Sequence, residues 1–513
     1  MADQQDVIAF LSNPGSYGLP AGAVTRHETH GSIVFLAGER AYKLKRAVKY
    51  AYLDYSTPAK RRAMCEAELA VNRRTAPELY LAVRAIARSG NGPLRFADAD
   101  DAGALDYVLV MRRFDQACLL EEMRKAGRLT PPLMRALAEA IAEFHRRAET
   151  APRFGGRDGI ARVIAENGEV LVGMIAAPFA AARVAQWRTD VQAALARLGG
   201  ALERRRETGH VRRCHGDLHL NNICLIDGKP VLFDAIEFED DFASIDTFYD
   251  LAFLLMDLDR HGLRAFANIV MNRYLERTLD FAGVEVLPLF LSCRAAIRAH
   301  VSVTTAKRTA YGADALMEDA VRLLGLAISY LQPQRARLVA MGGISGTGKS
   351  TVARALAPAL GMAPGAVILR SDVLRKQIVG IAEDARLDQA GYTEAVNARV
   401  YARMRALAVA VLRSGYCVIA DAVHGRADER DAIAAAARES GAAFTGLWLD
   451  APAPTLERRI VGRTERTSDA TVEVMHKQRS FVTVPRDWAK IDAGGDTDET
   501  IARARAALGE NHG

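Results

Sequence analysis

The sequence has few cysteines, and none of them are closely paired. Six cysteines are scattered along 513 residues without a C-x-x-C pair, which argues against a disulfide framework and against a cysteine zinc site. Long hydrophobic runs are also missing, because the longest strongly apolar stretch, LAFLLM at 251–256, is far too short to cross a bilayer. The first residues, MADQQDVIAFL, lack the basic-then-apolar order of a signal peptide. We therefore expect a cytoplasmic protein that does not associate with membranes.

A strong excess of charge of either sign is missing as well. The formal net charge is +6, and the arginines occur in small groups without interleaved aromatic residues. Nucleic-acid grooves usually have a denser basic face, so a nucleic-acid partner is the less favoured interpretation. Half of the residues are hydrophobic and a quarter are charged, as in ordinary globular proteins. The length predicts at least two domains, and no feature indicates the oligomeric state.

The first two thirds of the chain begin with expected strands and continue into helices. A hairpin is expected over 32–46, because two β-like runs flank AGER. Thr57 and Pro58 suit the N-cap and the first position of a helix. A strand is expected over 107–114 and an amphipathic helix over 133–149.

The last third shows a regular alternation of strands and helices. The apolar run RLVAMGG leads straight into a glycine-rich loop, and further strands are expected at 367–370, 415–421 and 444–450. This alternation predicts a parallel sheet covered by helices. The preceding segment LQPQRAR, 331–337, combines a proline with polar and basic residues and has no periodicity, as is typical of a linker. We predict domains at 1–333 and 334–513.

The glycine-rich loop GISGTGKS, 343–350, matches the pattern G-x-x-x-x-G-K-[ST] between an expected strand and an expected helix. Its glycines allow successive backbone N–H groups to converge on phosphate oxygens, and the helix N-terminus adds a favourable dipole. Lys349 would reach the β- and γ-phosphates of ATP, and the Ser350 hydroxyl would bind Mg²⁺. The expected nucleotide-binding residues are Gly343, Ser345, Gly346, Thr347, Gly348, Lys349, Ser350 and Thr351.

Acidic and basic residues downstream of this loop suit phosphoryl transfer. The second expected strand leads into Asp372, which could accept the proton of an attacking hydroxyl; an N-cap role for helix 373–379 is an equal alternative. The third strand ends in Asp421, an acid suited to hold Mg²⁺ or its water. In the arginine-dense segment that follows, Arg463 or Arg466 could neutralise the transferring phosphoryl group as a lid closes. Each arginine could instead lie on a solvated helix end.

Residues 337–513 resemble a group of P-loop kinases. The resemblance rests on GGISGTGKST, RSD, VIADAV and the arginine-rich segment, and it is to the kinases grouped with zeta toxins, gluconate kinase and polynucleotide 5′-kinases. It implies an α/β domain with a parallel sheet that transfers phosphate from ATP. These motifs do not discriminate among substrates.

A second set of phosphate-transfer residues lies upstream of this loop. HGDLHLNNI places Asn222 five residues after Asp217, and Asp234 in VLFDAIEF follows an apolar run. In a kinase-like site an acid orients and deprotonates the acceptor hydroxyl, while an asparagine and a second acid hold Mg²⁺. Asp217 would take the first role, and Asn222 and Asp234 the second. A zinc site at His215 and His219 is not favoured, because no third ligand lies at metal spacing.

A lysine of the expected hairpin should accompany this second set. AYK ends at Lys43 and mimics the A-x-K of a kinase strand, whereas Lys45 lies on the same strand face and stays an alternative. The partner should come from the helix after Thr57. Glu68 points inward there and would need a cation, and Glu66 is the alternative.

The residues around this second set resemble aminoglycoside phosphotransferases and choline-kinase-like enzymes, whose loop reads HGDxxxxN. The resemblance covers about 25–310 and includes AEFH, FDAIEF and FYDLAF. It implies an α+β, protein-kinase-like domain in which Asp250 ties down the catalytic loop. One departure is that the stretch before the hairpin, RHETHGSIVF, has a single glycine. In tandem order the chain resembles bacterial bifunctional proteins that join an aminoglycoside phosphotransferase-like domain to a P-loop ATP-binding domain.

Together these patterns predict a tandem ATP-dependent phosphotransferase with two nucleotide sites. Each domain would use ATP and Mg²⁺ to phosphorylate a hydroxyl acceptor. A small molecule is expected for the N-terminal domain, and a small molecule, nucleotide or polynucleotide end for the C-terminal domain. A regulatory alternative stays open, in which a kinase-like N-terminal domain senses a ligand without turnover and controls the P-loop domain.

Overall fold

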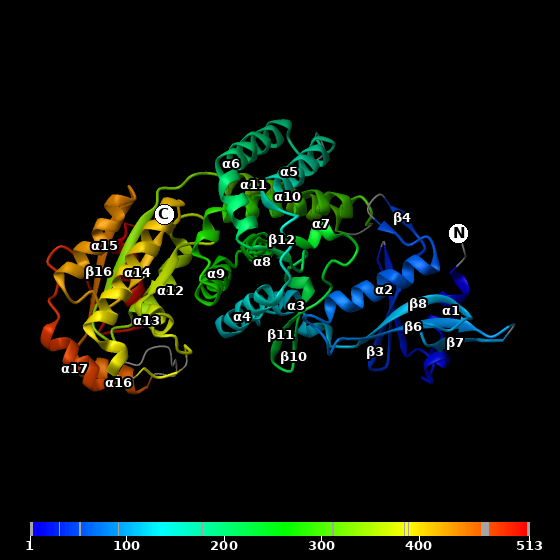
Figure 1. Ribbon diagram of the computed structural model, residues 1–513, viewed down its shortest axis with the longest axis horizontal. Helices are drawn as coiled ribbons and strands as arrows, with labels where there is room; N and C mark the ends of the chain where they lie inside the picture. Colours follow the sequence, from blue (N-terminus) through cyan, green and yellow to red (C-terminus); the bar gives the residue numbers. More distant parts are fainter. Residues whose placement is uncertain are drawn as a thin grey trace. The chain divides into compact units, whose positions relative to one another are not determined.

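The computed structural model describes residues 4–29, 31–50, 53–90, 92–175, 178–309, 312–383, 385–387, 389–462 and 471–509 (Figure 1). Its internal contacts define two compact units. The first unit is Met1–Ile160 with Leu202–Leu254, and the second unit is Ala161–Ala201 with Leu255–Gly513. The domain boundary expected near 333–337 stays a prediction. Within the described ranges, no helix combines the length and the apolar composition that crossing a membrane requires.

An antiparallel sheet forms the early part of the first unit. Its strand order is β1-β2-β3-β8-β6-β7, and the hairpin predicted over 32–46 is confirmed, because β2 (Ser32–Ala37) pairs antiparallel with β3 (Arg40–Lys45). The other elements are α1 (Gln5–Ser12), β1 (Val24–Glu28), β4 (Lys49–Tyr50), β5 (Leu53–Asp54), α2 (Pro58–Asn72), β6 (Tyr80–Arg88), β7 (Leu94–Ala97) and β8 (Ala104–Arg112).

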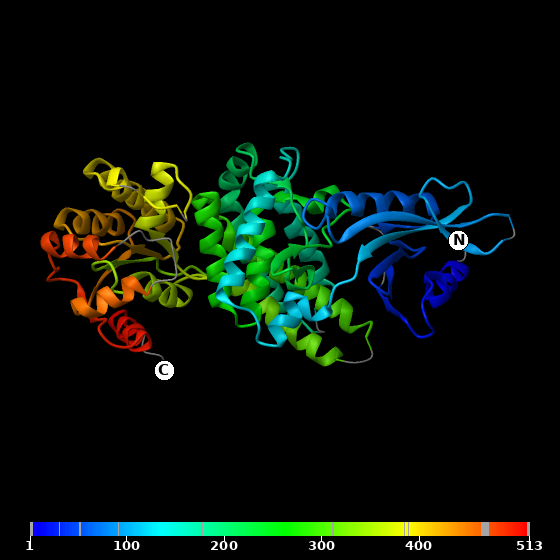
Figure 2. The ribbon, with the colours of Figure 1, turned by 90° about the horizontal axis from the view of Figure 1, so that it is seen from below.

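Helices α1 and α2 bury opposite faces of this sheet. Alternate residues of a strand point to opposite faces, so Leu109 of β8 packs with Cys65 of α2, while Val108 packs with Leu11 of α1. Figure 2 shows α2 lying along the sheet. As predicted, α2 begins after Thr57, whose side chain accepts a hydrogen bond from the backbone N–H of Lys60. The sheet and α2 thereby fix the positions of the hairpin lysines relative to the helix.

Two small strand pairs hold the segments that carry the second motif set. β9 pairs with β12, and β10 with β11, in both cases antiparallel. HGDLHLNN thus lies between β9 and β10, and FDAIEF follows β11. The elements are α3 (Leu120–Lys125), α4 (Pro131–Arg147), β9 (Val211–Arg213), β10 (Ile223–Ile226), β11 (Lys229–Leu232), α7 (Asp240–Ala243), β12 (Ser244–Asp246) and α8 (Thr247–Arg260).

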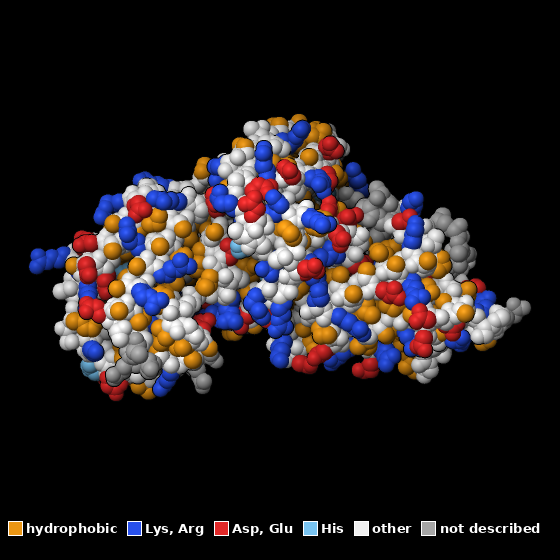
Figure 3. All heavy atoms as spheres, in the orientation of Figure 1, with side chains coloured by type: hydrophobic (Ala, Val, Ile, Leu, Met, Phe, Trp, Pro, Cys, Tyr) orange, Lys and Arg blue, Asp and Glu red, His pale blue; other side chains and the backbone are white. Residues whose placement is uncertain are grey.

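The second unit combines long helices with a five-stranded sheet. The helices that precede the sheet in the chain are α5 (Gly156–Val172), α6 (Ala181–Glu207), α9 (Arg264–Thr278), α10 (Leu287–Ala306) and α11 (Ala313–Ser329). Trp187 of α6 is buried and donates through Nε1 to Ser292 Oγ of α10 at 3.1 Å. On the face drawn in Figure 3, acidic and basic side chains lie interspersed over most of the surface.

The predicted parallel sheet of the C-terminal region is confirmed. All its strand pairs are parallel, in the order β14-β15-β13-β16-β17, so the carboxyl ends of the strands meet at one edge. Its strands are β13 (Arg337–Gly342), β14 (Val367–Arg370), β15 (Val418–Asp421), β16 (Ala443–Asp450) and β17 (Ala489–Asp492). Its helices are α12 (Lys349–Leu356), α13 (Ser371–Val379), α14 (Glu394–Arg413), α15 (Ala427–Glu439), α16 (Ala453–Val461), α17 (Val472–Phe481) and α18 (Thr497–Ala507).

Two asparagine side chains of helix α9 hydrogen-bond to the backbone of the edge strand β14 and of the residue before it. The side chain of Asn272 accepts from the N–H of Ile368 at 2.7 Å and donates to the carbonyl of Ala366 at 3.1 Å. Asn268 donates to the same carbonyl at 3.1 Å. An edge strand otherwise leaves such backbone groups without a strand partner. Two asparagine side chains of α9 therefore take the place of a neighbouring strand.

Candidate active sites

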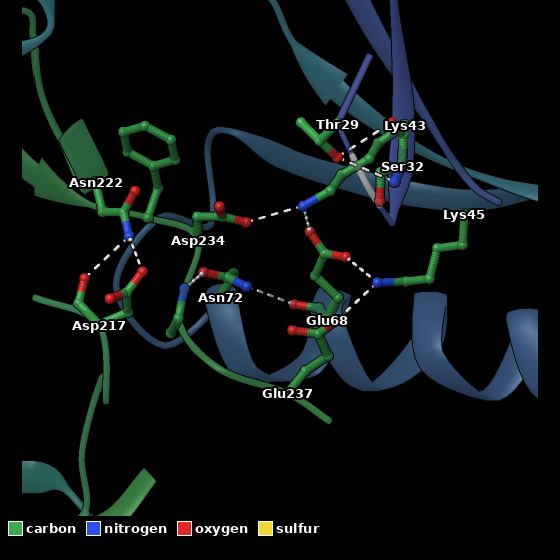
Figure 4. A network of polar contacts seen from close by, with 12 residues as sticks. Thr29, Ser32, Lys43, Lys45, Glu68, Asn72, Asp217, Asn222, Asp234 and Glu237 are labelled. Atoms are coloured by element: carbon green, nitrogen blue, oxygen red, sulfur yellow. Dashed lines mark hydrogen bonds and ion pairs between the residues drawn. The ribbon is translucent and has the colours of Figure 1, made fainter. Parts of the chain in front are cut away.

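The hairpin lysines and the predicted glutamate meet between β3 and α2 (Figure 4). Lys43 Nζ lies 2.7 Å from Glu68 Oε1, and Lys45 Nζ lies 2.6 Å from Glu68 Oε2. Burial alone would raise the pKa of Glu68, but the adjacent charges of Lys43 and Lys45 outweigh it and lower the pKa to about 2. Glu66 instead pairs with Arg62 at 2.8 Å near the surface. Both lysines thus contact the same buried carboxylate.

Lys43 also reaches the predicted metal ligand Asp234. Its Nζ lies 2.9 Å from Asp234 Oδ1, and the Asp234 side chain is 46% exposed. Burial would lower the pKa of Lys43, but the carboxylates of Asp234 and Glu68 raise it above the usual value. Asp234 has a φ of +61°, in the left-handed region that residues other than glycine seldom adopt. This backbone turn directs an accessible carboxylate toward the lysine.

Asp217 and Asn222 lie together in the loop between β9 and β10. Asn222 Nδ2 donates to Asp217 Oδ2 and to the Asp217 carbonyl, both at 2.9 Å. His219 Nε2 lies 3.3 Å from the same carboxylate oxygen. The Asp217 side chain is 39% exposed, so it can be reached by an acceptor. Figure 4 shows this pair on the segment next to Asp234.

Asp250 of α8 fixes the backbone of the HGD loop. Its Oδ2 accepts from the N–H of His215 at 3.1 Å, and its Oδ1 accepts from the N–H of Gly216 at 2.8 Å. His145 Nε2 lies 3.0 Å from Asp250 Oδ2. Gly216 has a φ of +86°, and a Cβ there would lie 2.9 Å from the Phe242 carbonyl oxygen, so a side chain at this position would clash. The prediction that Asp250 ties down this loop is confirmed.

The glycine-rich segment forms the loop between β13 and α12. Gly343 has a φ of +134°, and a Cβ there would lie 2.5 Å from the Leu449 carbonyl oxygen. Backbone of this kind is available only to glycine. Lys349 begins α12, and its Nζ donates to the carbonyl of Ile344 within the same loop at 3.0 Å. The lysine therefore lies over the loop whose N–H groups would bind phosphate.

The two metal-binding candidates of this region contact each other. Ser350 Oγ donates to Asp421 Oδ2 at 2.6 Å. Asp421 is buried at the carboxyl end of β15, and Arg370 Nε lies 3.9 Å from the same oxygen. A hydroxyl and a carboxylate are oxygen donors of the kind that Mg²⁺ prefers. This pair suits one metal ion beside the P-loop.

Asp372 and the two predicted lid arginines complete the set of predicted residues in this region. Asp372 lies in the first turn of α13, where the helix dipole favours an acid. The alternative in which Asp372 is the N-cap is wrong, because the helix begins at Ser371 and Arg370 occupies the cap position. Arg463 and Arg466 lie outside the described residues.

One contact to the P-loop, made by Gln478, could not be predicted from the sequence. Gln478 of α17 accepts through Oε1 from the backbone N–H of Ser345 at 2.8 Å. Backbone N–H groups of such loops bind phosphate, so Gln478 accepts from a group that a phosphate would otherwise be expected to use. A single glutamine in HKQRSF matches no motif, and only the tertiary structure identifies it.

Two family models match this chain. Residues 41–287 match the model described as the phosphotransferase enzyme family, and residues 338–485 match the model described as an AAA domain. The chain joins a phosphotransferase-family domain to an AAA-family domain that carries the P-loop. The first of these families is named for phosphoryl transfer, and the second domain carries the P-loop motif that binds nucleotide phosphates. The tandem order that the motifs predict is confirmed.

Relatives and solved structures resemble one or both domains. The chain is 29% identical over 502 residues to the Uncharacterized protein Rv2004c of Mycobacterium tuberculosis and to the Uncharacterized protein Mb2027c of Mycobacterium bovis, with 93% of this chain and 94% of each relative covered. A gluconokinase from Sinorhizobium meliloti 1021 is 22% identical over 35% of this chain and 94% of its own, with a TM-score of 0.26. A choline/ethanolamine kinase family protein from Mesorhizobium loti is 13% identical over 64% and 98%, with a TM-score of 0.38.

Proposed function

We propose that the chain is a tandem phosphotransferase in which each domain moves the γ-phosphate of Mg·ATP to a hydroxyl group. The observation that carries this proposal is that both sets of residues are assembled. Asp217 binds Asn222 beside Asp234 in one domain, and Ser350 binds Asp421 beside the P-loop in the other. Two separate sites explain why one chain carries two phosphate-transfer motifs. The proposed use of ATP, together with cysteines scattered without a C-x-x-C pair, favours action in the cytoplasm.

In the N-terminal domain the acids have separate roles. Asp217 would orient the acceptor hydroxyl and take its proton, while Asn222 and Asp234 would hold Mg²⁺. Asn222 donates to Asp217 through Nδ2, so its amide oxygen is not used in that hydrogen bond. Bound Mg·ATP supplies the phosphoryl group and charge neutralisation. The acceptor oxygen forms a bond to the γ-phosphorus, the bond from that phosphorus to the bridging oxygen breaks, and ADP leaves.

Lys43 would contact the phosphates in this domain, held in place by Glu68. A buried carboxylate needs a cation, and Glu68 therefore holds the Lys43 ammonium against α2 rather than leaving it in solvent. A small-molecule alcohol is the acceptor that we propose for this domain.

In the C-terminal domain Asp372 would take the acceptor proton. Lys349 would bind the β- and γ-phosphates, and Ser350 and Asp421 would hold Mg²⁺. Arg463 or Arg466 would supply the lid charge. The acceptor would be a small molecule, a nucleotide or a polynucleotide end, since the arrangement around Asp372 favours none of these three.

A labelling experiment tests both activities in the full chain. A metabolite extract is incubated with γ-labelled ATP and the wild-type protein, the Asp217→Asn variant, the Lys349→Ala variant or the double variant. We expect each single variant to lose a different labelled product and the double variant to lose both. If Asp217→Asn removes no product while Lys349→Ala removes all of them, the N-terminal domain does not catalyse transfer, and the regulatory alternative is favoured.

A further inference from the structure

Lys45 has its own set of partners, different from those of Lys43. Its Nζ donates to Glu68 Oε2 at 2.6 Å, to Glu237 Oε1 at 2.6 Å and to Tyr55 Oη at 3.2 Å. An ammonium group has three N–H donors, so these three contacts use all of them. Lys45 is also only 1% exposed. To bind a phosphate it would have to give up one of the buried partners.

Each residue of the segment 234–237, which begins with the proposed metal ligand Asp234, makes a hydrogen bond to another part of the first unit. Its backbone N–H groups are bound by three other parts of the first unit: that of Asp234 by Tyr80 Oη at 3.1 Å, that of Ala235 by Asn72 Oδ1 at 2.8 Å, and that of Ile236 by the His215 carbonyl at 3.0 Å. The next residue, Glu237, is bound through its side chain by Lys45. Lys45 therefore completes a series of contacts that fixes residues 234–237.

We propose that Lys45 is a positioning residue of the N-terminal site. Through Glu237 it would hold the segment 234–237 so that Asp234 presents its carboxylate to Mg²⁺, while Lys43 contacts the nucleotide. This inference rests on the proposed function of that site. Figure 4 shows the division: Lys43 points toward Asp234, and Lys45 lies on the other side of Glu68.

The local charges explain why a cation is needed at Lys45. Glu237 and Glu68 are both bound to the Lys45 ammonium, so their carboxylates lie close together. Burial and the neighbouring charge of Glu68 raise the pKa of Glu237, and Lys45 opposes this rise. Without the lysine the two acids would repel each other. Glu237 would then move, and it is only three residues from Asp234.

The dependence of ATP binding on Mg²⁺ tests this role. The parent protein is the full chain with Lys349→Ala, which silences the P-loop site. Three variants are made in this parent: Glu237→Gln, Lys43→Met, and the pair Lys45→Met with Glu237→Gln. We expect Glu237→Gln to raise the Mg²⁺ concentration for half-maximal ATP binding about tenfold, as changes behind a metal ligand do. The ATP affinity at saturating Mg²⁺ should stay within about twofold of the parent. The Lys45→Met, Glu237→Gln pair should raise the Mg²⁺ requirement at least as much as Glu237→Gln alone, because the pair also removes the contact between Lys45 and Glu68.

Lys43→Met should give the opposite pattern, with weaker ATP binding even at saturating Mg²⁺. Lys60→Met is the matched control, because Lys60 pairs with Asp54 at the surface, and it should change neither quantity. An unchanged Mg²⁺ requirement in Glu237→Gln would overturn the inference, as would loss of ATP affinity in that variant at saturating Mg²⁺. If the Lys349→Ala parent binds no ATP at all, the proposed function of the site itself fails.

Discussion

Asp217 and Asp234 are both partly exposed, but their neighbours differ. Asp217 accepts from Asn222 and lies beside His219, whereas Asp234 contacts the Lys43 ammonium. A base that touches the acceptor should affect the chemical step, and a metal ligand should affect binding of Mg·ATP. The proposed roles of the two acids can therefore be tested separately by substituting each acid.

We expect Asp217→Asn to leave Mg·ATP affinity nearly unchanged and to lower turnover by roughly a hundredfold or more. Asp234→Asn should weaken Mg·ATP binding, because a hard cation loses a carboxylate ligand. Calorimetry and single-turnover rates in the Lys349→Ala chain measure both effects. Melting temperatures show whether either variant is simply unstable. Equal losses of binding and turnover in the two variants would contradict the assignment of separate roles.

His424 is a buried histidine whose charge state links pH to stability. Burial lowers its pKa to about 4, with Lys349 and Arg430 contributing in the same direction. An unfolded histidine has a pKa of about 6.5. As the pH falls below that value the unfolded chain takes up the proton first, so the folded state loses stability.

From pH 7.5 to pH 5 this histidine alone should lower the free energy of unfolding by about 2 kcal/mol. The three tryptophans, at 187, 448 and 488, all lie in the second unit, so their fluorescence during urea unfolding reports on that unit. We expect His424→Gln to show a weaker dependence on pH than the wild type. Identical pH dependence in both proteins would mean that His424 does not remain neutral in the fold.

At the level of whole elements, α9 and β14 show how a helix can complete a sheet. Amide side chains of α9 bind the backbone of β14, and Asn272 both donates and accepts. A buried N–H that loses its acceptor costs much more than the hydrogen bond contributed, because it cannot bind water instead. The stability of β14 should therefore depend on α9.

Asn272→Ala should destabilise the second unit by about 1–3 kcal/mol, because the N–H of Ile368 is left buried without its acceptor. Urea unfolding followed by tryptophan fluorescence measures the loss. Asn397→Ala is the matched control, since the Asn397 amide makes one exposed contact of 3.4 Å to the Tyr392 carbonyl. Equal stability of the two variants would show that the side-chain amide does not support the strand.

Elements and contacts that depend on short stretches of chain can be predicted from the sequence, and those that depend on distant residues cannot. The P-loop and the Asp217–Asn222 pair lie within short stretches of chain, where spacing fixes geometry, so motifs identify them. The sequence does not indicate β17, because AKID is a four-residue edge strand with charged residues and little apolar signal. Asn268 and Asn272 match no motif, since their partners lie 94 to 98 residues away.

The choice between the hairpin lysines shows a second limit. Lys43 and Lys45 lie on one strand face, so the two-residue alternation of side chains along a strand does not assign a partner to each lysine. The residue that distinguishes them is Glu237, which is 192 positions from Lys45. Only the folded chain brings that acid to one lysine and Asp234 to the other.

For the molecule as a whole, the two proposed sites should bind two ATP molecules per chain. The lysine and acids of one site all lie in the first unit, and the P-loop with Ser350 and Asp421 lies in the second. We expect calorimetry to give two ATP per wild-type chain and one per Lys349→Ala chain, since the lysine provides phosphate contacts that the loop backbone cannot replace. Lys490→Ala, an exposed lysine of β17, is the control. One ATP per wild-type chain would contradict the tandem assignment.

The hydrogen bonds from α9 to β14 matter when the chain is cut into separate fragments. A cut at residue 334 separates the sheet from Asn268 and Asn272, and the backbone groups of Ala366 and Ile368 lose their partners. An uncovered strand edge is a template for pairing with another chain. Fragments that begin there would tend to associate edge to edge and to aggregate as their concentration rises. Such aggregation would reflect the missing helix, and a soluble P-loop fragment would need a cover for that strand.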